Sequence, residues 1–139
     1  MEAGEVELTA LEQATDILFD RTYRGEPAAF TIKVCFADVG ALAVEIMQPL
    51  SGPSIFAEHL ARHGEGIHHV AFDIERRPWK ERLAAFAERG FDVAQSGRFN
   101  YRNAFAFVDT ENATGTTFEP TTSRPATSGR SRRRGFPGL

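Results

Sequence analysis

The stretch "GEGIHHVAFDI", residues 64–74, places two neighbouring histidines at the start of an apolar run. Imidazole nitrogens bind metals and exchange protons near neutral pH, so each histidine is a candidate for chemistry. The run is typical of a β-strand, in which neighbouring side chains point to opposite faces. We therefore predict different roles for the pair: His69 faces the polar side of the strand with Asp73, and His68 joins the packed side with Val70.

Two other predicted strands carry a carboxylate with the same alternation. Glu45 lies opposite the bulky face of "ALAVEIM", and Glu119 lies opposite Phe118 in "GTTFEP". We expect the bulky faces to pack under helices and the opposite faces to form one concave surface. Glu45, His69 and Glu119 then converge. Two carboxylates and an imidazole suit a divalent metal of intermediate hardness, such as Mn, Co, Ni, Fe or Zn.

Each of these residues also has an ordinary interpretation. A single glutamate on a strand is usually solvated, and a single histidine is usually packed or on the surface. His59 and His63 lie one helical turn apart, a spacing that can bind a metal, but we expect them on a solvated helix face. The matching alternation in three strands is what favours a shared site.

The elements that position these residues follow from the hydrophobic pattern. Alternating and β-branched runs predict strands, and the apolar spacing in "RPWKERLAAFAERG" predicts a helix. Residues 11–27 are ambiguous and fit a short helix followed by a loop, and "ENATG" (111–115) is expected to form a turn. The expected strands are 5–10, 29–39, 41–48, 66–74, 91–96, 101–109 and 115–119, and the expected helices are 51–64 and 77–90.

Length and composition indicate one soluble globular domain. The 139 residues are 42% hydrophobic and 25% charged, and no apolar run approaches the roughly 18–20 residues that span a bilayer. The N-terminus is acidic and does not resemble a secretory signal. Cys35 is the single cysteine, which excludes an internal disulfide framework and favours a cytoplasmic setting.

Charge is unevenly distributed along the chain. Residues 121–139 contain five arginines and no acidic residue, whereas residues 1–120 are acidic. An acidic body argues against nucleic acid as the main ligand. The tail is rich in Ser, Thr, Pro, Gly and Arg, so we expect it to be disordered. The tail has two interpretations: a basic arm that binds nucleic acid or anionic lipid, and a solvated extension without a role. We favour the solvated extension.

The segment "LAVEIMQPLSGPSIFAEHLARHGEGIHHVAFDI", residues 42–74, closely resembles the linker region of methylmalonyl-CoA epimerases. These enzymes belong to the vicinal oxygen chelate superfamily, with glyoxalase I, extradiol dioxygenases and bleomycin-resistance proteins. "ERGFDV" and the closing "GTTFE" also fit, so the resemblance covers about residues 25–120. It implies an α+β fold of βαβββ modules whose sheets form a cup around one metal.

The resemblance also implies how the chain is divided. Residues 1–50 correspond to a truncated first module of three strands, 51–64 to a linker helix, 65–120 to a complete βαβββ module, and 121–139 to the basic tail. The strand and helix that open the first module, with a histidine that serves as fourth ligand, are expected to be missing. Metal ligands are expected at Glu45, His69 and Glu119, with Glu119 also as catalytic base.

Three functions follow from this reading. The first is a metal-dependent isomerase, epimerase or lyase acting on a small molecule, for example an acyl-CoA such as methylmalonyl-CoA. The second is a non-catalytic small-molecule binding protein of the resistance type, and the third is an inactive or partner-dependent form. Arg102 is a candidate for a substrate carboxylate or CoA phosphate, or else a surface arginine, and Lys33 is a second candidate for the cup. We expect a homodimer with no membrane partner.

Overall fold

The computed structural model describes residues 7–11, 18–39, 42–74, 78–99, 101 and 103–122, which form two β-sheets and three helices. The first sheet has the strand order β1-β4-β5 and the second the order β3-β2-β7-β8-β9-β6. Neighbouring strands are antiparallel, except that β6 and β9 are parallel. The strands are β1 (Glu7–Leu11), β2 (Leu18–Tyr23), β3 (Glu26–Pro27), β4 (Thr31–Val39), β5 (Leu42–Ser51), β6 (His69–Asp73), β7 (Val93–Phe99), β8 (Asn103–Val108) and β9 (Thr117–Thr121), and the helices are α1 (Ile55–His63), α2 (Trp79–Ala87) and α3 (Glu111–Thr114).

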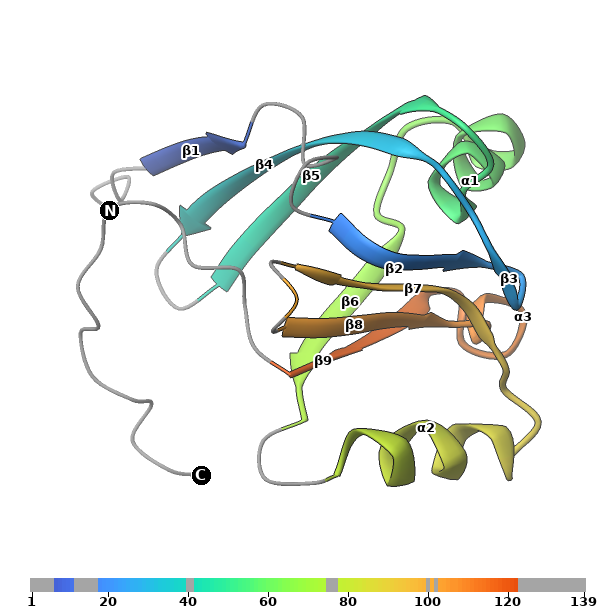
Figure 1. Cartoon of the computed structure of the whole chain (residues 1–139). Helices are drawn as coiled ribbons and strands as arrows, with labels where there is room; N and C mark the ends of the chain where they lie inside the picture. Colours follow the sequence, from blue (N-terminus) through green and yellow to red (C-terminus); the bar gives the residue numbers. More distant parts are fainter. Residues whose placement is uncertain are drawn as a thin grey trace.

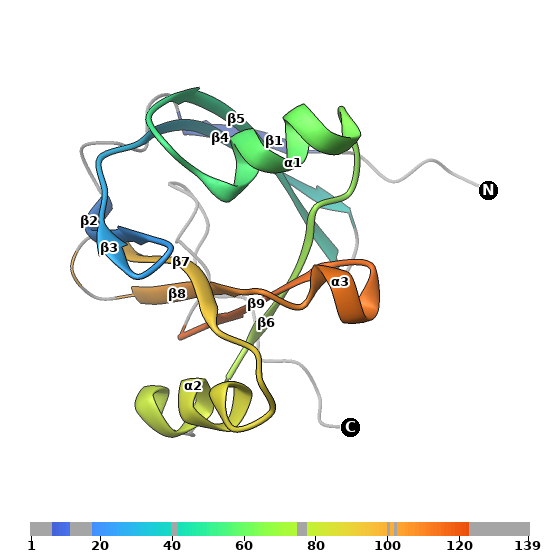
Figure 2. The same ribbon diagram turned by 90° about the vertical axis from the view of Figure 1, so that its right-hand side faces the viewer.

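The elements form layers around the six-stranded sheet. The three-stranded sheet and α1 lie on one side of it, and α2 lies on the other (Figure 1). Figure 2 shows the same layers after a quarter turn, with α3 at the end of the six-stranded sheet. One antiparallel and one mixed sheet with few helices make this an α+β fold, as the sequence predicts.

A hydrophobic core joins the two sheets and α1. On β4, Ile32, Val34 and Phe36 are buried, whereas the intervening Lys33 is exposed, as expected for a strand with one packed face. Apolar burial of this kind is the main favourable term in folding. The other buried members of the core are Leu18, Phe30, Ile55, Phe56, Ala94, Phe99, Phe105 and Phe107.

Helix α1 is fixed at both ends. The Ser54 hydroxyl caps its start by accepting a hydrogen bond from the Ala57 N–H at 3.2 Å. The first helical N–H, that of Ile55, donates to Oε1 of Gln95 on β7 at 3.0 Å. Gly64 ends the helix with a φ of 75°, a left-handed value that favours glycine. The helix predicted over 51–64 ends at Gly64 as expected, but it begins only at Ile55, because Ser54 is its N-cap.

The outer face of β5 differs from the prediction. Its bulky residues were expected to lie under a helix, but Leu42, Val44 and Ile46 are 72%, 46% and 53% exposed. The reason is the position of α1, which contacts β5 but contributes its own buried residues, Ile55 and Phe56, to the core. Within the described residues, no helix covers these three side chains.

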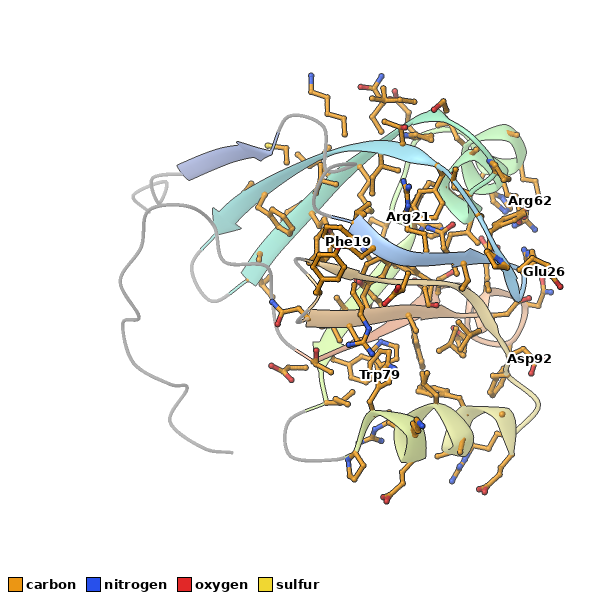
Figure 3. The ribbon with its side chains drawn as sticks, in the orientation of Figure 1. Phe19, Arg21, Glu26, Arg62, Trp79 and Asp92 are labelled. Carbon is orange, nitrogen blue, oxygen red and sulfur yellow. The ribbon has the colours of Figure 1, made fainter. Side chains whose placement is uncertain are left out.

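Helix α2 packs on the far side of the six-stranded sheet, as its apolar stripe predicts. Trp79 points from α2 towards that sheet (Figure 3), and it is half-buried together with Leu83 and Phe86. The helix covers the outer face incompletely, because Val70 and Phe72 on β6 remain 53% and 37% exposed.

Two segments have a different structure from the one predicted. Residues 18–27 form β2 and β3 instead of part of a short helix and loop, so the described part of residues 1–50 has five strands where three were expected. Pairing of β2 with β7 and burial of Leu18 outweigh the local helical pattern. Residues 111–114, expected as a turn, form the short helix α3, which ends at Gly115 with a φ of 77°.

Some predicted features lie outside the described residues. These are Arg102 and the basic tail from residue 123 onward. Of the residues expected in the tail, Thr121 is the last residue of β9 and Thr122 follows it. None of the helices in the described ranges is long and apolar enough to cross a membrane.

Candidate metal centre

Glu45, His69 and Glu119 lie together at the interface of the two sheets. Nε2 of His69 is 3.2 Å from Oε2 of Glu45 and 3.5 Å from Oε2 of Glu119. One ligand atom from each residue lies within 4.8 Å of the other two. The side chains of His69, Glu45 and Glu119 are only 9%, 16% and 8% exposed, so the group is shielded from bulk water.

Strand alternation explains why the three side chains meet. On β5, Glu45 and Met47 are half-buried while the flanking Val44 and Ile46 are exposed. In the other sheet, parallel pairing places Ala71 of β6 opposite Glu119 of β9. Since residues two apart on a strand share a face, His69 and Glu119 point the same way. The predicted alternation thus places these side chains correctly.

The electrostatics of the group are unfavourable without a cation. Burial raises the pKa of Glu119 well above its usual range, and the negative charge of Glu45 raises it further. Two shielded carboxylates beside one imidazole therefore carry a repulsion that a divalent cation would remove.

The donor set and its spacing fit a divalent transition metal. Around a tetrahedral Zn²⁺ with bonds of about 2.0–2.1 Å, neighbouring ligand atoms are about 3.3 Å apart. The two measured separations, 3.2 and 3.5 Å, bracket that value. Two oxygens and one nitrogen also suit Mn, Fe, Co or Ni, so the residues do not select one metal.

His68 contacts the centre in a way that strand alternation does not predict. Its Nδ1 lies 3.1 Å from Nδ1 of His69, leaving Nε2 of His69 directed at the carboxylates. Strand β6 begins at His69, so His68 precedes the strand and need not point to the opposite face. Its ring also packs edge-on against Phe56, as expected for a packed residue.

The surroundings keep His68 uncharged at neutral pH. Burial, followed by the neighbouring His69 and His59, lowers the pKa of His68 to about 4. When Nδ1–H of His69 donates to Nδ1 of a neutral His68, the lone pair on Nε2 of His69 is free to bind a metal. Metal-ligating histidines are usually oriented by such a partner.

A small cavity extends from the two carboxylates into the core. Glu45, Gln95 and Glu119 supply its polar lining, and five phenylalanines supply most of the rest. Its free volume is about 10 Å³, room for about one water molecule. The five phenylalanines are Phe30, Phe56, Phe99, Phe105 and Phe107.

Gln95 is a functional candidate that the sequence pattern did not single out. Its side chain is fully buried, and its Oε1 accepts the Ile55 N–H. Its Nε2 has no hydrogen-bond partner in the part of the chain that the structure describes. A buried amide without a partner is costly, so this N–H group is available to a ligand in the cavity.

The remaining candidates from the sequence do not join the centre. Lys33 is exposed on β4, where it pairs with Gln48, whereas Glu45 pairs with Phe36. Arg102 lies outside the described residues. Within the described ranges, no fourth His, Cys, Asp or Glu belongs to the group.

Comparison with known proteins identifies the family. The model of the glyoxalase/bleomycin resistance protein/dioxygenase superfamily matches residues 5–107, and the chain therefore belongs to this superfamily. A hypothetical protein from Bacillus halodurans C-125 has a similar solved structure, with a TM-score of 0.55 and 23% identity over 88% of this chain and 80% of that one. No significant match was found among curated proteins. The α+β fold class of the glyoxalase type is thus confirmed.

Proposed function

We propose that the protein is a metal-dependent isomerase, epimerase or lyase-type enzyme with its centre at Glu45, His69 and Glu119. The observation that carries the proposal is the convergence of these three shielded side chains from two different sheets. Each has a donor atom suited to a divalent metal, and the carboxylates repel each other without one.

The bound cation would act as a Lewis acid that stabilises negative charge on substrate oxygens. The chain's own residues would then remove and return the substrate proton. Glu119 lines the cavity and is the proposed general base, because its carboxylate lies beside the space that a substrate would enter. Glu45 is the other titratable side chain in the described lining, and it is the candidate for the opposite face of the substrate.

Gln95 is proposed to orient the substrate. Its unpartnered Nε2–H would donate to a carbonyl or carboxylate oxygen in the cavity. The present cavity is too small for such a molecule, so substrate entry requires the surrounding phenylalanine side chains to move apart.

We propose an acyl-CoA as the substrate class, with methylmalonyl-CoA as the first compound to test. Support comes from the resemblance of residues 42–74 to methylmalonyl-CoA epimerases. In this chain, that segment contains both the strand end with Glu45 and the "IHHVAF" strand with His69. Epimerisation beside a thioester needs an acid/base group and charge stabilisation on oxygen, and the proposed centre offers both kinds of group.

A second candidate function is non-catalytic binding of an aromatic or apolar molecule. The observation that favours it is the cavity lining, in which five phenylalanines surround three polar side chains. An apolar ligand could fill such a site without any metal.

Exchange of the α-proton tests the enzymatic proposal. Purified protein is incubated with methylmalonyl-CoA in D₂O, with and without Co²⁺, and deuterium uptake is followed by mass spectrometry. We expect uptake that requires Co²⁺ and falls at least about a hundredfold in Glu119→Gln, with Glu81→Gln on the exposed face of α2 as the matched control. If none of a panel of acyl-CoA thioesters takes up deuterium, and apolar ligands bind to the protein in the presence of EDTA, the second function is favoured instead.

A further inference from the structure

A second cluster of metal-ligating side chains lies where α1 meets α3. His59 and His63 project from α1, and Glu111 is the first residue of α3. Nδ1 of His59 lies 3.3 Å from Oε1 of Glu111, and Nε2 of His63 lies 3.4 Å from the same oxygen. The three donor atoms are all within 4.8 Å of one another.

The solvated helix face that the sequence favoured holds for His63 but not for His59. The side chains of His59 and Glu111 are 14% and 20% exposed, and only His63 is half-exposed at 52%. The i, i+4 spacing brings both imidazoles to the same side of α1 with their ring centres 5.0 Å apart. The fold therefore holds two imidazoles against one carboxylate, with one open side towards solvent.

The spacing and donor types suit a zinc ion. The separations of 3.3 and 3.4 Å match the roughly 3.3 Å between neighbouring ligands of tetrahedral Zn²⁺. Two histidines and one carboxylate are a familiar zinc donor set that leaves a fourth position for water. His63 also lies in the last turn of α1, where the helix carbonyls carry partial negative charge that favours a cation.

Arg62 is the charged neighbour that opposes a cation. One of its guanidinium nitrogens lies 3.3 Å from Oε2 of Glu111, and the same group lies 3.6 Å from Glu58. The oxygen facing the histidines is Oε1, so Arg62 occupies the other side of the carboxylate. Its side chain is 51% exposed and lies beside α1 at the edge of the molecule (Figure 3).

We propose that His59, His63 and Glu111 form a second divalent-metal site, suited to Zn²⁺, that ties α1 to α3. It is separate from the centre at Glu45 but close to it in the packing. The ring of His59 lies 4.8 Å from that of His68, which in turn hydrogen-bonds to His69.

The test counts bound Zn²⁺ by isothermal titration calorimetry on untagged full-length protein. We expect two ions per wild-type chain. His63→Ala and Glu111→Gln each lose one ion, Glu45→Gln loses the other, and the double variant His63→Ala with Glu45→Gln loses both. Circular dichroism confirms that each variant is folded, and Glu81→Gln is the control that retains two ions.

Arg62→Gln gives a signal that loss of structure cannot imitate. Removing the guanidinium should tighten Zn²⁺ binding at the second site by about two- to fivefold, the range of a partly exposed charge pair. The second site is refuted if His63→Ala and Glu111→Gln bind as many ions as wild type with unchanged affinity, or if Arg62→Gln leaves the affinity unchanged. Full stoichiometry in Glu45→Gln would instead count only against the first centre.

Discussion

Oε2 of Glu119 lies 3.5 Å from Nε2 of His69, and the two side chains project from parallel neighbouring strands, β6 and β9. Glu45 completes the group from the opposite sheet. The centre thus depends on how the two sheets are packed as well as on local strand geometry. This arrangement has consequences for stability, for metal affinity and for the packing that holds the sheets together.

Glu119→Gln should stabilise the metal-free protein. Glu119 is buried beside Glu45, and a neutral amide avoids the cost of a negative charge there. We expect the free energy of unfolding, measured by urea denaturation in EDTA at neutral pH, to rise by about 1 kcal/mol or more.

The difference in the free energy of unfolding between Glu119→Gln and the wild type should also depend on pH. Because the pKa of Glu119 is raised in the folded state, its penalty is present above the unfolded glutamate pKa of about 4.3. The advantage of Glu119→Gln should therefore shrink as the pH falls towards that value. Glu81→Gln, on an exposed part of α2, should change stability by less than about 0.5 kcal/mol at any pH. A destabilised Glu119→Gln in EDTA would contradict the proposed repulsion.

His68→Phe should weaken metal binding at the first centre without unfolding the protein. Phenylalanine keeps the aromatic contact with Phe56 but removes the 3.1 Å contact with His69. Loss of such an orienting partner typically costs about 10- to 100-fold in metal affinity. Calorimetric titration with Co²⁺, on a background of His63→Ala, measures the first centre alone. Unchanged affinity would show that His68 only packs.

Gly52→Ala should be much more damaging than Gly25→Ala. Both glycines have a left-handed φ, 78° and 86°, so each substitution carries strain of about 1–2 kcal/mol. A Cβ at Gly52 would also lie 2.2 Å from the Ala29 carbonyl oxygen, whereas a Cβ at Gly25 meets nothing within 4 Å. Thermal unfolding should show a clearly larger loss for Gly52→Ala. Equal losses would mean that the β5–α1 connection can shift away from Ala29.

The exposed stripe on β5 offers a test of the expected homodimer. Leu42, Val44 and Ile46 form a solvent-exposed apolar row on an edge strand of the described sheet. If two copies pair there, Ile46→Lys should shift sedimentation from dimer to monomer. The control is Glu26→Lys, which adds a lysine at an exposed position on β3 in the other sheet. A dimer that persists in Ile46→Lys would place the interface elsewhere.

Much of the candidate centre was predictable because strand alternation is local. The period of two assigns Glu45, His69 and Glu119 to one side of their strands, and the strands themselves have strong β patterns. The role of His68 was not predictable in this way, since it lies just outside β6. Gln95 was missed because a buried glutamine on a strand has no distinctive spacing.

The errors in the fold have a tertiary origin. Residues 18–23 have a helix-compatible local pattern, yet they form β2 because β7 offers a pairing edge. The bulky row on β5 looked like a packed face, but α1 directs its apolar residues into the core. His59 was expected in solvent, and only the position of α3 explains its contact with Glu111. None of these partners is adjacent in sequence.

The most direct test of the central claim is an anomalous diffraction measurement on crystals soaked in Co²⁺. We predict an anomalous peak within about 2.0–2.3 Å of Nε2 of His69 and of one oxygen each from Glu45 and Glu119. The peak should vanish in crystals of Glu45→Gln soaked in the same way. Well-ordered crystals of the wild-type protein with no anomalous density between these three side chains would contradict the claim.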